Sequence, residues 1–355
     1  MTTAALIHAF EVWSAEKRPL VLATVYDTEG STYSKAGAQM LITGDTTFQG
    51  MLSGGCLEGD LAERARAVIE TGVPQAVTYD LGKNDEELWG LGVGCDGLMR
   101  IFLQNLDPGR NYEPFGTMVG VLDGDRTEIA VTVIQSGSSA WVPASTLVTV
   151  DGRVAFSDIG KAQAGCLDPM IEVTLENQKS AIHEVGDADD SALVLVAALV
   201  PPPNIIILGA GLDAEPVLRY ALELGWRVTV QDHRSAYLET GNFDGARKVH
   251  CVPADQIAQT ADLDRFDAAI VMSHHLASDR AYLSQLARTD MRYIGLLGPP
   301  DRRCRLLEDL DDVGELLEGR VHGPAGLEIG GRGPAAIALS IVAEMHRALI
   351  CPATD

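Results

Sequence analysis

The C-terminal half of the chain contains the stretch Ile205-Ile206-Ile207-Leu208-Gly209-Ala210-Gly211-Leu212-Asp213-Ala214. Its four leading apolar residues are typical of a parallel strand that is covered on both faces. A helical pattern follows the glycine turn and continues to Gly225. A second strand is predicted over 227–231, and it ends at Asp232, 21 residues after Gly211. The stretch therefore predicts a strand, a GxGxxA turn, a helix and a second strand that ends in an acidic residue.

This order of elements is that of a Rossmann-type βαβ unit, which binds a phosphate at its first turn. Gly209 permits the tight turn, Gly211 lets the backbone approach a phosphate, and Ala214 allows close packing of the helix on the sheet. We expect Asp232 to accept a hydrogen bond from a ribose 2′-hydroxyl, which favours NAD over NADP.

The prolines at 201–203 predict a stiff connector just before this unit, because proline cannot occupy a helix interior. We therefore expect two domains, over 1–200 and 201–355. The N-terminal domain is predicted to be α+β, with a mostly β extension over about 110–199. The following segments show strand patterns: 20–27, 38–43, 75–81, 98–103, 127–134, 145–150, 171–174, 192–199, 248–252, 268–272 and 293–297. Helical patterns cover 6–17, 57–70 and 334–350.

Composition narrows the class of protein. The 355 residues are 46% hydrophobic, which is ample for two cores, and the formal net charge of −23 disfavours nucleic acid as a partner. The six cysteines are scattered and form no disulfide framework. The longest apolar run, 192–200, is too short to span a membrane, and the N-terminus lacks the basic start of a signal peptide. We expect a protein of the reducing cytoplasm.

Two cysteines stand in glycine-rich loops. Cys56 follows Gly54 and Gly55 and directly precedes a helical pattern, so we expect its sulfur to lie among free backbone N–H groups, where a thiolate is favoured. Cys95 lies in the similar stretch Gly92-Val93-Gly94-Cys95-Asp96-Gly97. These loops suggest soft-metal or sulfur chemistry. The alternative is a small buried hydrophobe in a tight turn.

Further candidates lie in the C-terminal half. His274 follows the predicted strand 268–272 at its carboxyl end, where open α/β sheets bind ligands. Arg302 and Arg303 follow Gly298 and supply cations for a phosphate. His322 begins the glycine-rich loop 323–330 and could face the same crevice. The alternatives are an ordinary loop histidine and solvated arginines.

Several ordered segments coincide with one family pattern. They are 22–41, Ser53-Gly54-Gly55-Cys56-Leu57-Glu58-Gly59, Gly94-Cys95-Asp96-Gly97, Pro201-Pro202-Pro203, Gly209-Ala210-Gly211, 225–228, 232–234, 293–298 and 322–330. The chain resembles the XdhC/CoxI family of accessory proteins for molybdenum hydroxylases such as xanthine dehydrogenase. In one respect it departs from the family, because many members have Cys-Gly-Gly where this chain has Cys95-Asp96-Gly97.

The resemblance implies a maturation chaperone rather than a turnover enzyme. It implies binding of the molybdenum cofactor (molybdopterin, plain or as a dinucleotide), support for exchange of an oxo for a sulfido ligand, and delivery to an apo molybdenum hydroxylase. A cysteine desulfurase-type sulfur donor is the expected second partner, and the oligomeric state, a homodimer included, stays open. Cys56 would ligate the metal or carry persulfide sulfur. Glu58 would transfer protons or orient the pterin, or is simply a carboxylate in a first helical turn.

Two other functions compete with this one. A NAD(P)-dependent oxidoreductase would use the glycine turn and Asp232, although no proton-relay group stands out in the first domain. A non-enzymatic scaffold would recruit a sulfurtransferase and an apo-enzyme and leave the turn vestigial.

Overall fold

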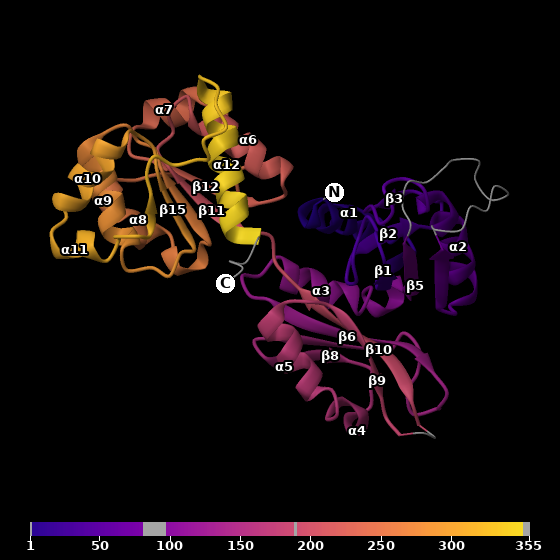
Figure 1. The fold of residues 1–355 in the computed structure, drawn as a ribbon. Helices are drawn as coiled ribbons and strands as arrows, with labels where there is room; N and C mark the ends of the chain where they lie inside the picture. The colour runs from indigo at the N-terminus through magenta and orange to yellow at the C-terminus, as the bar shows by residue number, and fades with distance from the viewer. Residues whose placement is uncertain (1, 81–96, 188–189, 351–355) are drawn as a thin grey trace. The chain divides into compact units, whose positions relative to one another are not determined.

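The computed structural model describes residues 2–80, 97–187 and 190–350. The chain forms two compact units, Met1–Pro201 and Pro202–Asp355. Figure 1 labels most of their helices and strands. Each unit has its own sheets and hydrophobic cores, and each is described by itself below.

The N-terminal unit begins with a five-stranded antiparallel sheet of order β3-β2-β1-β5-β4. Alternate residues of its central strand point to opposite faces. Leu20 and Leu22 join one apolar core, and Val21 and Ala23 join another. The first core also contains residues of α1 and α3, and the second contains residues of α2. The elements are α1 (Thr3–Ala15), β1 (Leu20–Glu29), β2 (Gln39–Thr43), β3 (Phe48–Gln49), α2 (Glu58–Thr71), β4 (Gln75–Asp80), β5 (Leu98–Leu106) and α3 (Phe115–Leu122).

A second antiparallel sheet completes this unit, in the order β8-β7-β6-β10-β9. Its apolar core includes residues of α5 and of strands β6 and β10. The elements are β6 (Glu128–Ser136), β7 (Thr146–Val150), β8 (Arg153–Ser157), α4 (Lys161–Ala164), α5 (Asp168–Asn177), β9 (Ala181–Val185) and β10 (Ala192–Leu199).

One strand predicted in this region is wrong. The segment 171–174 lies inside helix α5, and Pro169 occupies the first turn of that helix. Proline is favoured at this position because its missing N–H would have no partner there in any case. Four alternating residues are too few to separate a strand from a helix, and the Asp168-Pro169 pair is the better signal.

The C-terminal unit is built on a six-stranded sheet of order β13-β12-β11-β14-β15-β16, and all five pairings are parallel. Both faces are covered, since Ile205 and Ile207 belong to one core and Ile206 and Leu208 to the other. Helices α6 and α12 cover the first face and α9 covers the second (Figure 1). The strands are β11 (Asn204–Leu208), β12 (Arg227–Asp232), β13 (Lys248–Cys251), β14 (Ala268–Val271), β15 (Tyr293–Leu296) and β16 (Val321–His322). The helices are α6 (Ala214–Glu223), α7 (Ser235–Thr240), α8 (Ile257–Thr260), α9 (Leu276–Leu286), α10 (Pro300–Glu308), α11 (Asp312–Glu315) and α12 (Pro334–Ile350).

The predicted fold class is confirmed. An α+β unit with antiparallel sheets precedes a Rossmann-type parallel sheet, whose carboxyl edge carries the glycine turn between β11 and α6. Within the described ranges, no helix has both the length and the apolarity to cross a bilayer.

Candidate functional site

The Cys56 loop lies between β3 and α2 in the N-terminal unit. Gly54 and Gly55 have φ angles of +82° and +108°, in the left-handed region that side chains disfavour. A Cβ atom at Gly55 would meet no other atom within 4 Å, so the backbone conformation, and not crowding, calls for glycine there. Cys56 is a free cysteine and is exposed to solvent. The loop therefore presents a thiol on an open surface.

Glu58 holds this loop in place. Its side chain is buried, and its two carboxylate oxygens accept hydrogen bonds from the N–H groups of Leu52 (2.8 Å), Ser53 (2.9 Å), Gly55 (3.0 Å) and Leu57 (3.2 Å) and from Ser53 Oγ (2.6 Å). Burial acts to raise the pKa of Glu58, but the hydrogen bonds from Ser53 and Leu52 outweigh it and hold the pKa below its ordinary value. An ionised carboxylate with five donors is suited to organising a loop and not to passing protons near neutral pH.

Some of the amides expected to be free around Cys56 already have acceptors. The N–H of Cys56 donates to Ser53 Oγ (3.1 Å), and the N–H of Leu57 donates to Ser53 Oγ (2.8 Å) as well as to Glu58. The protein's own side chains therefore already satisfy several amides at this turn. The sequence pattern could not show this, because it depends on Glu58 folding back over the loop from the first turn of α2.

An aromatic residue that the sequence patterns do not single out lies beside the loop. The ring of Tyr33 lies 3.3 Å from the place where a Cβ of Gly54 would stand, and the residue is 60% exposed. Tyr33 also lines a cavity of about 360 Å³ together with Met51 and Gln39. An exposed aromatic side chain next to a cavity is a signal in the structure that no local sequence pattern carries.

The other candidate thiol, Cys95, lies outside the described residues. Within 2–80, 97–187 and 190–350, no group of three or more His, Cys, Asp or Glu side chains is arranged to hold a metal ion.

The glycine turn of the C-terminal unit is tightly packed at its first residue. Gly209 has a φ of +123°, and a Cβ there would lie 2.6 Å from the carbonyl group of Met272 on the neighbouring strand connection. Gly211 is different, because its Cβ would meet only the His274 ring, at 3.7 Å. Ala214 is fully buried at the start of α6. Gly209 is thus required by the fold, whereas Gly211 keeps open space above the turn.

Asp232, whose spacing predicts a contact with a ribose, already has hydrogen-bond partners within the protein. It is fully buried, and its carboxylate accepts hydrogen bonds from the Ala210 N–H (2.7 Å) and from Arg234 through N–H (2.9 Å), Nε (2.9 Å) and Nη2 (2.6 Å). Burial acts to raise the pKa of Asp232. The hydrogen bonds from Arg234 and Ala210 have the larger, opposite effect, so the pKa lies below its ordinary value. The ionised Asp232 carboxylate therefore links the glycine turn to Arg234 and stabilises the turn.

Arg302 forms an ion pair within the C-terminal unit. Its Nη2 and Nε lie 2.6 Å and 3.2 Å from Oδ2 of Asp279, which is fully buried in α9. Asp279 in turn accepts a hydrogen bond from Ser273 Oγ, and the Ser273 carbonyl accepts one from Arg234 Nη2 (3.2 Å). A hydrogen-bond network therefore runs along the carboxyl edge of the sheet. Because Arg302 belongs to it, the prediction that Arg302 binds a phosphate is not supported by this geometry.

His274 is exposed at this edge, and Arg303 is half-buried. His274 has a φ of +59°, is exposed, and places Nε2 3.1 Å from Oδ2 of Asp213. Arg303 packs its methylene groups against Gly323, and its buried Nε has no hydrogen-bond partner among the described residues. Of the two arginines predicted to bind phosphate, Arg303 is the one that the described contacts leave available.

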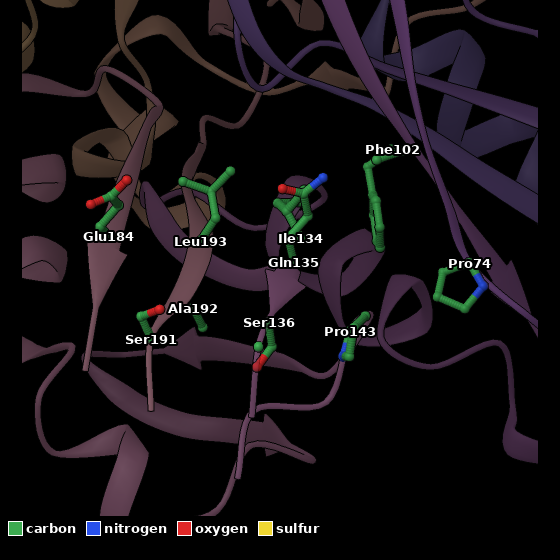
Figure 2. Close-up of a pocket in the computed structure, with 12 residues that line it drawn as sticks. Pro74, Phe102, Ile134, Gln135, Ser136, Pro143, Glu184, Ser191, Ala192 and Leu193 are labelled. Carbon is green, nitrogen blue, oxygen red and sulfur yellow. The ribbon is translucent and has the colours of Figure 1, made fainter. Parts of the chain in front are cut away.

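A groove of about 740 Å³ opens elsewhere in the N-terminal unit, as Figure 2 shows. Phe102, Ile134 and Leu193 supply apolar surface, and Glu184 supplies a carboxylate. None of the residues predicted for the site lines it. Its described lining contains no cysteine, histidine, lysine or arginine, so we assign it no role in metal, sulfur or phosphate chemistry.

Comparisons with known proteins fit these two units. Residues 13–80 match the family model described as XdhC and CoxI family, and residues 205–345 match the model described as XdhC Rossmann domain. The chain belongs to the XdhC and CoxI family. The matched segments contain the Cys56 loop and the glycine turn, so both candidate regions lie in the parts that define the family.

The chain is similar to curated proteins and to solved structures. The chain is 31% identical over 333 residues to a protein of Bacillus subtilis (strain 168) that is named as a probable xanthine dehydrogenase subunit, covering 93% of each chain. It is 22% identical over 231 residues to "Uncharacterized protein YqeB" of Escherichia coli (strain K12), covering 61% of this chain and 42% of that one. It is also similar to a crystal structure described as a xanthine dehydrogenase from Bacillus halodurans, at a TM-score of 0.77 and 28% identity, covering 98% of this chain and 96% of that one.

Proposed function

We propose that this chain is an accessory protein of a xanthine dehydrogenase-type molybdenum hydroxylase. In this proposal it binds the molybdenum cofactor, supports its sulfuration and inserts it into the apo-enzyme. Membership of the XdhC and CoxI family supports an accessory role, and two relatives carry xanthine dehydrogenase in their names. The partners are the apo-hydroxylase and a cysteine desulfurase-type sulfur donor.

The observation that carries the proposal is the exposed Cys56 thiol on a loop that Glu58 holds in shape. A thiolate suits a soft metal centre and can also carry sulfur as a persulfide. Gly55, which has no atom within 4 Å of the place where its Cβ would stand, leaves the backbone beside Cys56 open to a bulky ligand. When bound, the cofactor supplies the molybdenum centre that becomes competent on sulfuration.

Two residues of the Cys56 loop have different roles in this proposal. Cys56 contacts the metal or the sulfur, while Glu58 fixes the loop that presents it. In the C-terminal unit, the start of α6 just after the glycine turn suits an anionic ligand of that unit. No turnover chemistry is required of the chain in this proposal, which makes it a maturation chaperone.

The rival function, a NAD(P)-dependent oxidoreductase, is favoured by the strand order of the parallel sheet and by the Gly209 turn. The engagement of Asp232 with Arg234 and Ala210 weighs against it, because a ribose hydroxyl would have to displace charge-assisted hydrogen bonds from a buried site. Titration with NADH separates the two functions. Tight binding with substrate turnover would favour the dehydrogenase.

The experiment that tests the proposal is activation of a purified apo-hydroxylase by the wild-type chain and by Cys56→Ala. We expect Cys56→Ala to keep its melting temperature and to lose most of the activation. Cys166→Ala is the matched control, because Cys166 is also a free, exposed cysteine of the same unit, and it should activate like the wild type. Full activation by Cys56→Ala would remove the thiol from the mechanism.

A further inference from the structure

A buried carboxylate of helix α12 lies beside strands β15 and β16 of the parallel sheet. Glu344 of α12 is 9% exposed and accepts hydrogen bonds from the hydroxyl of Tyr293 (2.7 Å) and from the N–H of Gly326 (2.8 Å). Burial, and then the hydrogen bond to Glu344, raise the pKa of Tyr293, so its hydroxyl stays a donor. These contacts fix the position of the Glu344 carboxylate.

His322 is held against this carboxylate. Its Nδ1 lies 3.4 Å from Oε1 of Glu344, and its ring stacks on the ring of Tyr293 with centroids 4.5 Å apart. The side chain of His322 is 37% exposed. With one ring nitrogen facing a carboxylate and one face covered by an aromatic ring, the imidazole has a fixed orientation that leaves Nε2 for another group.

The side chain of Arg303 packs against Gly323, the residue that follows His322. Arg303 comes from α10, which begins just after β15, and a Cβ built at Gly323 would lie 3.0 Å from its Cδ and 3.2 Å from its Cβ. Its Nε is buried and has no acceptor among the described residues, whereas the neighbouring Arg302 is paired with Asp279. A buried N–H of a charged group without an acceptor is costly, and an anionic ligand would satisfy it.

Both side chains stand at the carboxyl edge of the sheet, next to the ends of β15 and β16. Ligands of open parallel sheets bind at this edge. A guanidinium matches the geometry of a phosphate through two parallel N–H groups, and an imidazole can add a third contact.

We propose that Arg303 and His322 form a binding site for a phosphate or diphosphate group, with Glu344 and Tyr293 as positioning residues for the imidazole. This site is distinct from the glycine turn at Gly209 and from the Cys56 loop. It goes beyond the proposed function and does not depend on it, since a phosphate ester from any source would meet the same two side chains.

The test is calorimetric titration of the full-length protein with inorganic phosphate, pyrophosphate and acetate. We expect one saturable site for phosphate or pyrophosphate and weaker binding of acetate. Tighter binding of pyrophosphate indicates a diphosphate ligand, and equal binding indicates a monoester. Each of Arg303→Met and His322→Gln should weaken binding about tenfold or more, the effect of losing one hydrogen bond to a charged group. Arg305→Met, on the same helix and exposed, should stay within about twofold of the wild type.

Nitrogen-15 NMR of the histidine side chains provides a second readout on the wild-type protein, which has eight histidines. Pyrophosphate should move the ring signals of His322, and Glu344→Gln should change the balance between the two ring tautomers of His322 without ligand, because the carboxylate that faces Nδ1 is lost. In calorimetry, the proposal is overturned if the wild type shows no saturable site, if acetate binds as well as phosphate, or if Arg305→Met weakens binding as much as Arg303→Met. In NMR, it is overturned if pyrophosphate does not move the His322 signals. A failure here would leave the Cys56 proposal standing, because that proposal is tested by hydroxylase activation.

Discussion

Replacing Glu58 by glutamine tests whether one buried carboxylate holds the Cys56 loop. The substitution keeps the size of the side chain but turns one carboxylate oxygen into an NH₂ group. In one orientation this NH₂ faces the N–H groups of Gly55 and Leu57, and in the other it faces those of Leu52 and Ser53. In the second orientation two backbone donors lose their acceptor, and in the first only the Gly55 N–H does, because the N–H of Leu57 also donates to Ser53 Oγ.

The size of the effect follows from these contacts. A buried N–H left without an acceptor costs about 1–3 kcal/mol, so the cost is about 1–3 kcal/mol in the first orientation and about 2–6 kcal/mol in the second, before the loop relaxes. Because the glutamine adopts the less costly orientation, we expect Glu58→Gln to lower the free energy of unfolding by about 2 kcal/mol. Glu70→Gln, at an exposed position near the other end of α2, should change it by less than about 0.5 kcal/mol.

The pH dependence gives an independent check. The folded-state pKa of Glu58 lies below its ordinary value of 4.5, because hydrogen bonds from Ser53 and Leu52 outweigh the effect of burial. The unfolded state therefore binds more protons between the two pKa values, and stability rises with pH in that window. The stabilisation is complete above pH 4.5 and is lost as the pH falls through the folded-state pKa. The difference in unfolding free energy between wild type and Glu58→Gln should shrink over the same range.

Urea unfolding measures the free energies, and hydrogen exchange of the amides at 52–57 reports the loop itself. We expect faster exchange at these amides in Glu58→Gln and faster reaction of Cys56 with a thiol reagent, since the loop opens more often. If Glu58→Gln unfolds at the same urea concentration as Glu70→Gln, with unchanged exchange at 52–57, Glu58 does not organise the loop.

Two further predictions concern the carboxyl edge of the parallel sheet. Gly209→Ala should lower the melting temperature more than Gly211→Ala does, by an amount equivalent to about 2 kcal/mol, because only the first adds a Cβ atom in the left-handed region and against backbone; similar melting temperatures by calorimetry would refute this. Asp279→Asn should cost about 3–5 kcal/mol, because it leaves Arg302 without its buried counter-charge; a loss in urea unfolding under about 1 kcal/mol would show that this pair does not brace the edge.

The parallel sheet could be predicted well from the sequence for a physical reason. A strand covered on both faces must be apolar throughout, so 205–208 stands out, and Gly209 marks the turn because no other residue fits against Met272. The strand predicted at 171–174 is part of helix α5, because a short alternating run carries too little information to exclude a helix. Strand β16 has two residues, too few for a detectable pattern.

The site was predicted less completely than the fold. The position of Cys56 before a helix is visible in the sequence, but the use of the nearby amides by Glu58 depends on a side chain folding back, which spacing does not show. The same holds for Asp232 and Arg302, whose charges are satisfied by Arg234 and Asp279 within the fold. Position along the chain identifies residues near a site, whereas their hydrogen-bond partners decide which of them are free to bind a ligand.

The most direct test of the proposed function is the molybdenum and pterin content of the protein purified from cells that make the cofactor. We predict close to one molybdenum and one pterin per wild-type chain, and a large loss of both in Cys56→Ala with the fold intact. A wild-type protein that is isolated without either, and that stays empty after incubation with the cofactor, would contradict the proposal.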